Sequence, residues 1–129
     1  YLYKEKLVNI FKQVVHNACC GNEKKPGLIA VSGLDYTVDK NAGKLLAMNV
    51  IDNYGNKNCI DINNPNKNKY YVIAMDEFLL EANADYPKFG ELSECLNIYP
   101  YDKDVMVCEY IKELNKPIII NQLGRIHFI

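Results

Sequence analysis

Several residue types are absent or scarce in this 129-residue chain, and each shortage excludes a kind of site. There is no Trp, there are only two His, and the fifteen basic residues are fourteen Lys and one Arg. With Arg125 alone, the two-pronged guanidinium clamps that commonly hold phosphates can scarcely be built. Two Ser and one Thr leave few hydroxyl nucleophiles. Two distant His, with no Cys-x-x-Cys or His-x-His pair, form no metal-binding motif.

Charge and hydropathy exclude further classes of protein. Fifteen basic and sixteen acidic residues give a net charge of -1, whereas nucleic-acid coats and polybasic membrane anchors need excess positive charge on one face. No apolar run approaches the roughly 18 residues of a membrane span. No charged leader precedes an apolar core, so we expect no signal peptide. We therefore expect one domain over residues 1–129, with no nucleic-acid polymer as partner and no membrane span.

The odd number of cysteines excludes a fully paired intrachain disulfide framework. The adjacent pair Cys19-Cys20 leaves open a thiol site in which His16 would be the base. The alternative is that these cysteines are small buried side chains. The five cysteines are Cys19, Cys20, Cys59, Cys95 and Cys108.

Apolar periodicity predicts two main helices, over residues 5–20 and 104–114. Gly21 and Asn115 provide their stop signals. We expect the second helix to turn Val105, Val107, Cys108, Ile111 and Leu114 inward. The first helix carries a buried stripe at helical spacing, namely Leu7, Ile10, Phe11, Val14, Val15 and Ala18.

Short apolar or alternating runs predict about five strands. The turn residues 39–43 join the first two strands in a hairpin with a five-residue loop. Residues 63–69 form an exposed loop, residues 76–82 turn helical, and residues 83–101 are loop-like. We expect an α+β domain in which a mixed β-sheet with hairpins is packed by the two main helices. The strands are expected over residues 27–38 (interrupted at Ser32-Gly33), 44–51, 58–62, 70–75 and 124–129.

Four stretches, in the right order, resemble the C-terminal domain of the 5'-nucleotidase family, which includes UDP-sugar hydrolases and 2',3'-cyclic-nucleotide phosphodiesterases. The helix over residues 7–16 resembles a helix of that domain. The run Ala30-Val31-Ser32-Gly33-Leu34, with Asp39 and a Gly-Lys turn, is similar to the family's Gln-Val-Ser-Gly-Leu strand and hairpin. Residues 71–79, running on to 86–89, resemble a strand, an Asn-Phe-Leu helix start and a Gly-Gly-Asp-Gly-Phe/Tyr loop. Gly124-Arg125-Ile126 matches the closing Gly-Arg-Ile.

The resemblance implies a division of labour between two domains. In the family, an N-terminal metallophosphatase domain holds two divalent metals and performs the hydrolysis, while the C-terminal domain binds the base and ribose of the nucleotide. This chain contains no Asp-x-His, Gly-Asn-His-Asp/Glu or Gly-His-x-His motif. We therefore expect no cofactor in this chain, no catalysis by it alone, and a metal-bearing N-terminal domain of the same polypeptide as its partner.

The substrate-binding residues that the resemblance implies are Phe78, Asn83, Asp85 and Tyr86. Phe78 matches the family aromatic that stacks on the base. The family's ribose-binding acid falls on Ala84, and Asp85, one residue further on, replaces it if the loop shifts. The second stacking Phe and an Asn-Gly-Gly-Gly-Ile-Arg segment would lie upstream, so we expect the chain to lack the domain's first strands.

Three hypotheses follow. The first is the substrate-recognition part of a 5'-nucleotidase-like phosphoesterase, for which family analogy implies an extracytoplasmic location. The second is a degenerate binding or interaction module that keeps the fold without nucleotide affinity, suggested by Ala82-Asn83-Ala84-Asp85 in place of Gly-Gly-Asp-Gly. The third is the thiol enzyme using Cys19 or Cys20 near His16.

Overall fold

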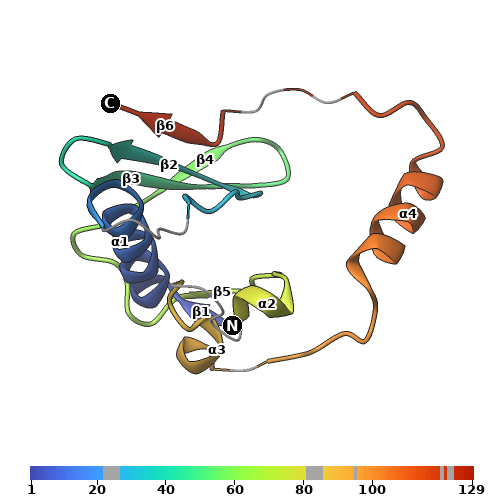
Figure 1. Ribbon diagram of the computed structural model, residues 1–129, viewed down its shortest axis with the longest axis horizontal. Coiled ribbons are helices and arrows are strands. Elements are labelled where there is room, and N and C mark those ends of the chain that lie inside the picture. Colours follow the sequence, from blue (N-terminus) through green and yellow to red (C-terminus); the bar gives the residue numbers. More distant parts are fainter. Residues whose placement is uncertain (22–26, 81–85, 95, 120, 122–123) are drawn as a thin grey trace.

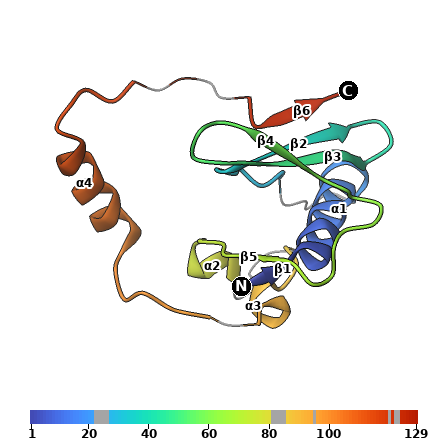
Figure 2. The same cartoon turned by 180° about the vertical axis from the view of Figure 1, so that it is seen from behind.

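The computed structural model describes residues 1–21, 27–80, 86–94, 96–119, 121 and 124–129 (Figure 1). One helix packs on a four-stranded sheet, a two-stranded sheet with two short helices lies at one end of that helix, and a further helix stands apart (Figures 1 and 2). The helices are α1 (Lys4–Cys20), α2 (Glu77–Leu80), α3 (Phe89–Leu92) and α4 (Lys103–Leu114). The strands are β1 (Leu2–Tyr3), β2 (Leu34–Asp39), β3 (Lys44–Ile51), β4 (Lys57–Ile60), β5 (Tyr70–Tyr71) and β6 (Ile126–Phe128).

Helix α1 forms the central packing surface of the fold. The predicted stripe is confirmed except at Ala18, which is only partly buried, and Val8 joins the buried set. The ring of Phe11 meets that of Tyr36 on β2 edge to face, with centroids 5.0 Å apart. The helix ends where the Gly21 N–H donates to the Asn17 carbonyl at 3.1 Å. Helix α1 therefore covers one face of the four-stranded sheet, and the core lies between them (Figure 1).

The predicted hairpin is present as β2 and β3. Asp39 pairs with Lys44, which leaves four residues in the connection rather than the expected five. The Asp39 Oδ1 accepts the N–H groups of Asn41 and Ala42, each at 2.9 Å. The first strand begins at Leu34, not near residue 27 as expected, because Gly33 turns the chain with φ 70° and its carbonyl accepts the Ile51 N–H at 2.9 Å.

The four-stranded sheet is mixed and has the order β4-β3-β2-β6. The pairs β3–β4 and β2–β3 are antiparallel, whereas β6 is parallel to β2. Gly124, at φ 57°, precedes β6, and the Arg125 carbonyl accepts the Tyr36 N–H at 3.0 Å. The expected α+β class and mixed sheet are confirmed.

The second sheet is small and consists of β1 and β5. The strand predicted over residues 70–75 ends at Tyr71, because β1 offers only two residues to pair with it. Helix α2 confirms the helical turn predicted near residue 76, and α3 lies in a stretch that was expected to be a loop.

Helix α4 forms as predicted, but the expectation that its apolar side chains face inward is wrong. No side chain of α4 is buried. Its C-terminal limit is set locally, since it ends at Asn115 in the left-handed conformation with φ 44°, whereas the Asp102 side chain at its start makes no capping hydrogen bond. Figures 1 and 2 both show α4 away from the rest of the chain, joined by long extended segments. Of the two main helices, therefore, only α1 packs on the sheet.

Candidate functional site

Phe78 lies in the first turn of α2, with its ring held outward. The Asp76 Oδ1 accepts the Phe78 N–H at 3.0 Å, and the Asp76 carbonyl accepts the Leu79 N–H, also at 3.0 Å. This Asp caps the short helix at its start, which fixes the backbone of Phe78. The Phe78 side chain is 54% exposed. A flat aromatic partner can therefore reach one face of the ring without any rearrangement of the core.

Asp76 also connects this turn to α4. The Lys103 Nζ donates to the Asp76 Oδ2 at 2.6 Å. That hydrogen bond is the main reason why the pKa of Asp76 lies below its ordinary value, and the Phe78 N–H adds to the effect. The same contact holds the pKa of Lys103 above its ordinary value. One carboxylate thus fixes the start of α2 and accepts a hydrogen bond from the long Lys103 side chain of α4, a contact that no sequence pattern predicts.

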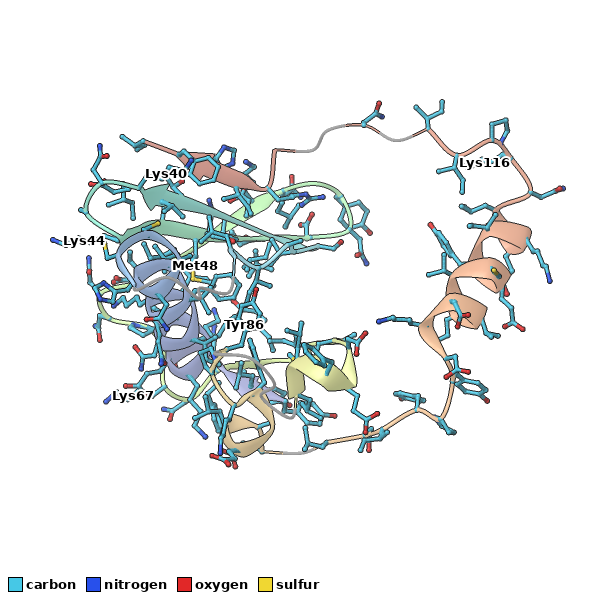
Figure 3. The ribbon with its side chains drawn as sticks, in the orientation of Figure 1. Lys40, Lys44, Met48, Lys67, Tyr86 and Lys116 are labelled. Carbon is cyan, nitrogen blue, oxygen red and sulfur yellow. The ribbon has the colours of Figure 1, made fainter. Side chains whose placement is uncertain are left out.

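Tyr86, the second predicted residue that the structure describes, is partly buried. Figure 3 shows it between the four-stranded sheet and α2. Its hydroxyl donates to the Gly27 carbonyl at 2.9 Å. The pKa of Tyr36 is raised, mainly by burial and to a smaller extent by the nearby Tyr86. The Tyr36 hydroxyl donates to the Ile29 carbonyl at 2.8 Å. The Tyr86 hydroxyl hydrogen is therefore used within the protein, and its predicted substrate contact would use the ring or the hydroxyl oxygen as an acceptor.

Asn83 and Asp85 lie outside the described residues, as does the whole segment 81–85. The described helices on either side, α2 and α3, are in contact. A Cβ on Gly90 of α3 would lie 3.0 Å from the carbonyl oxygen of Leu80 at the end of α2. This approach needs a residue as small as Gly. It brings α3 against the end of α2, two residues after the exposed Phe78.

A buried charged group that sequence analysis did not select is Asp35 on β2, with only 2% of its side chain exposed. Its Oδ1 accepts the Asn49 Nδ2 at 2.7 Å. Its Oδ2 forms an ion pair with the Lys57 Nζ and lies 3.8 Å from the His127 Nε2. Burial by itself raises the pKa of Asp35, but the hydrogen bonds from Lys57 and Asn49 and the charges of Lys57 and His127 outweigh it, so the pKa lies below its ordinary value.

The Asp35 cluster joins four strands, because Asp35, Asn49, Lys57 and His127 come from β2, β3, β4 and β6 respectively. The strand register explains two of its contacts. Asp35 lies opposite Asn49 of β3, and His127 of β6 lies opposite Thr37, which is two residues from Asp35 on the same strand. The predicted hairpin could have indicated the Asp35–Asn49 contact, but the parallel return of β6 has no sequence signal. The cluster contains no nucleophile, and its charged groups pair with one another. Its role is therefore structural: it links the four strands.

The hypothesis of a thiol site receives no geometric support. His16 is exposed on α1, and in the described part of the chain no hydrogen bond joins it to Cys19 or Cys20. The Cys20 sulfur lies against Gly43 in the turn between β2 and β3. A base must lie within hydrogen-bond reach of its thiol to activate it. Cys20 therefore packs on this turn rather than pairing with an imidazole.

Comparison with known proteins gives no match to a protein-family model, a curated protein or a solved structure. Within the described ranges, no group of three or more His, Cys, Asp or Glu side chains is placed to hold a metal ion. Among the helices that the structure describes, none combines the length and the apolar character needed to cross a bilayer.

Proposed function

We propose that this chain is the substrate-recognition part of a 5'-nucleotidase-like metallophosphoesterase and binds the nucleoside part of a nucleotide. The observation that carries the proposal is the exposed Phe78 ring, whose backbone is fixed by Asp76 at the start of α2. An aromatic ring whose backbone is already ordered can stack on a base at a small entropic cost. The loop residues Asn83 and Asp85 would supply polar contacts to the ribose.

Two of the motifs that resemble the family contain a glycine with a positive φ, which supports the proposal. Gly33 of the Val-Ser-Gly-Leu run has φ 70°, a conformation that L side chains rarely adopt. Gly124 of the closing Gly-Arg-Ile has φ 57° and leads into the parallel strand β6. The resemblance thus includes residues that this backbone requires, in addition to apolar positions that any fold could share.

The proposal assigns binding to this chain and bond cleavage to an N-terminal dimetal domain of the same polypeptide. Hydrolysis of a phosphate ester by two metals requires clustered His and Asp ligands and an activated water. This chain has two His, on α1 and β6. Phe78, Asn83, Asp85 and Tyr86 would position the nucleoside so that its phosphate reaches the two divalent metals of the other domain.

A second candidate function, an interaction module that has lost nucleotide affinity, is favoured by α4. Its side chains include an exposed apolar group that no other part of the described chain covers. Exposed apolar patches of this kind commonly mark contacts between proteins. The group consists of Val105, Met106, Val107, Tyr110 and Ile111.

Calorimetric titration of the two-domain protein with adenosine, guanosine, cytidine and uridine tests the proposal. Replacement of a stacking ring by Ala costs about 1–3 kcal/mol per base, so Phe78→Ala should weaken binding about five- to 150-fold. The matched control is Phe128→Ala, since the Phe128 ring is similarly exposed at 50% and lies on β6. Equal affinities of wild type and Phe78→Ala, or no binding of any nucleoside, would reject the proposal and leave the interaction module.

A further inference from the structure

Three tyrosines line a cavity at the β1–β5 sheet. In β1, Leu2 is buried in the core, so alternation along the strand turns the neighbouring Tyr1 and Tyr3 to the opposite face. The antiparallel register pairs Tyr3 with Tyr70 of β5, which brings Tyr70 to that face as well. Two short strands thus assemble three phenol rings at one surface. Figures 1 and 2 show these strands, β1 and β5, next to the N-terminal end of the chain.

The rings stand nearly perpendicular to one another. Tyr1 and Tyr70 have centroids 5.1 Å apart and an interplanar angle of 83°. Tyr3 and Tyr70 have centroids 6.2 Å apart and an angle of 90°. In such edge-to-face pairs each ring covers only part of its neighbour, and the exposed Tyr1 and Tyr70 keep ring surface open to a ligand. Together with Glu94 they line a cavity of about 180 Å³.

Glu94 gives this aromatic cavity a carboxylate wall. The Glu94 N–H donates to the Tyr1 carbonyl at 3.0 Å, which holds the segment after α3 against β1. The Glu94 Oε1 accepts the Lys6 Nζ at 3.0 Å. The Glu94 side chain is still 52% exposed. A ligand in the cavity therefore meets electron-rich ring faces and a negative charge at the same time.

The surroundings of the cavity already bind ammonium groups. The Lys6 Nζ lies 5.8 Å from the centroid of the Tyr3 ring. On the opposite face of the same small sheet, where Tyr71 pairs with Leu2, the Lys4 Nζ lies 5.0 Å from the centroid of the Tyr71 ring. Both distances are within the range in which a cation is attracted to the face of an aromatic ring. The protein thus shows, with its own side chains, which kind of charge these rings favour.

We propose that Tyr1, Tyr3, Tyr70 and Glu94 form a binding site for a quaternary ammonium group, such as the trimethylammonium of choline or of an N-trimethylated lysine. The methyl groups of such a ligand fill an aromatic cage, and its charge interacts with the ring faces and with Glu94. A hard metal ion would need several oxygen ligands, of which the cavity offers one carboxylate. A planar base would need parallel rings, and these rings are perpendicular.

The site differs from the proposed nucleoside site, because its four lining residues include neither Phe78 nor Tyr86. Lys6 acts as a competing cation, since it occupies Glu94 and one side of the Tyr3 ring. Removal of its charge in Lys6→Met should therefore tighten binding of a quaternary ammonium ligand. Weaker binding by Lys6→Met would contradict a site that selects positive charge.

The test is titration of this chain with choline chloride, followed by aromatic ¹H–¹³C NMR at constant ionic strength. The control ligand is 3,3-dimethylbutan-1-ol, which has the shape of choline without its charge. We expect saturable binding of choline and at least about fivefold weaker binding of the alcohol. A parallel titration with N-trimethyl-lysine identifies which of the two carriers of the group fits better. Equal affinities for choline and the neutral alcohol, or no saturable binding of either ammonium ligand, would overturn the proposal.

Variants locate the binding. Tyr70→Leu should weaken choline binding about two- to thirtyfold, and Glu94→Gln should also weaken it, whereas Tyr70→Phe, which keeps the ring face, should bind nearly as wild type. The matched control is Tyr54→Leu, because Tyr54 is 91% exposed in a turn outside the cavity. If Tyr54→Leu weakened binding as much as Tyr70→Leu, or if Tyr70→Phe lost as much as Tyr70→Leu, the assignment to this cavity would be wrong.

Discussion

Asp35→Asn is the most informative single substitution in the Asp35 cluster, because it changes the charge and almost nothing else. The two carboxylate oxygens face donors on both sides, Asn49 on Oδ1 and Lys57 on Oδ2. An Asn at this position keeps one acceptor and directs an NH₂ group at a donor. The site is almost fully buried, so water cannot compensate for that mismatch.

The expected decrease in the free energy of unfolding of Asp35→Asn has two contributions. Loss of a buried hydrogen bond to a charged group costs about 1.5–3 kcal/mol. The Lys57 side chain is 57% exposed, so it can return to water, and its ion pair adds less than about 1 kcal/mol. We therefore expect the free energy of unfolding to fall by about 2–3 kcal/mol at pH 7. For a chain of this length, that lowers the urea midpoint by roughly 1 M.

Urea unfolding followed by circular dichroism measures this difference. The matched control is Asp61→Asn, since Asp61 is exposed and its Oδ1 accepts the N–H groups of Asn63 and Asn64, which an Asn oxygen can also do. We expect that control to change the free energy of unfolding by less than about 0.5 kcal/mol. A loss for Asp35→Asn no larger than that of Asp61→Asn would refute the role given to the cluster.

Acidification gives a second measurement of the same contribution. The pKa of Asp35 is lowered in the folded state, so the unfolded chain takes up a proton at a higher pH than the folded one. The stabilisation by this carboxylate is thus complete above the unfolded value of about 4 and is lost as the pH falls through the folded value. The difference between wild type and Asp35→Asn should shrink at pH 3. A difference that stayed constant between pH 7 and pH 3 would contradict the pKa shift.

Three further predictions concern the core, a turn and α4. Tyr36→Phe removes the hydroxyl that donates to the Ile29 carbonyl and should lower the free energy of unfolding by about 0.5–1.5 kcal/mol in thermal or urea unfolding. Gly43→Ala should cost more than Gly55→Ala, since both have positive φ but only a Cβ on Gly43 meets the Cys20 sulfur; equal losses would contradict this contact. Amide hydrogen exchange should be much faster in α4 than in α1, because an unpacked helix of 12 residues is marginal in water. Equal protection would mean that α4 is packed in solution.

Local patterns in the sequence predicted several elements correctly, for physical reasons that apply within a few residues. The stripe of α1 follows the helical period, and all but one of its members are buried. The β2–β3 hairpin follows from alternation and from turn residues such as Asp39, whose side chain caps the turn. The family motif Val-Ser-Gly-Leu coincides with a positive φ at Gly33. Phe78 was selected only by resemblance, and the structure places its ring at the surface.

Two of the predictions that failed needed a distant partner. The apolar residues of α4 imply burial, but no other element of the described chain covers them. The run 70–75 has the composition of a strand, and only its first two residues find a partner in β1. Composition shows that a side chain favours burial or pairing. It does not show whether a second surface lies within reach.

The sequence by itself determined the α+β class, the helix α1, the hairpin and the turns, because periodicity, capping and backbone preference are local properties. Only the tertiary structure decided which polar and aromatic groups meet. Asp35 is buried because β6 returns parallel to β2 and brings His127 beside it. Tyr1, Tyr3 and Tyr70 form one cavity because β1 pairs with β5 in a single register. A shift of one residue in either pairing would turn these side chains to the opposite face, so the two sites depend on register.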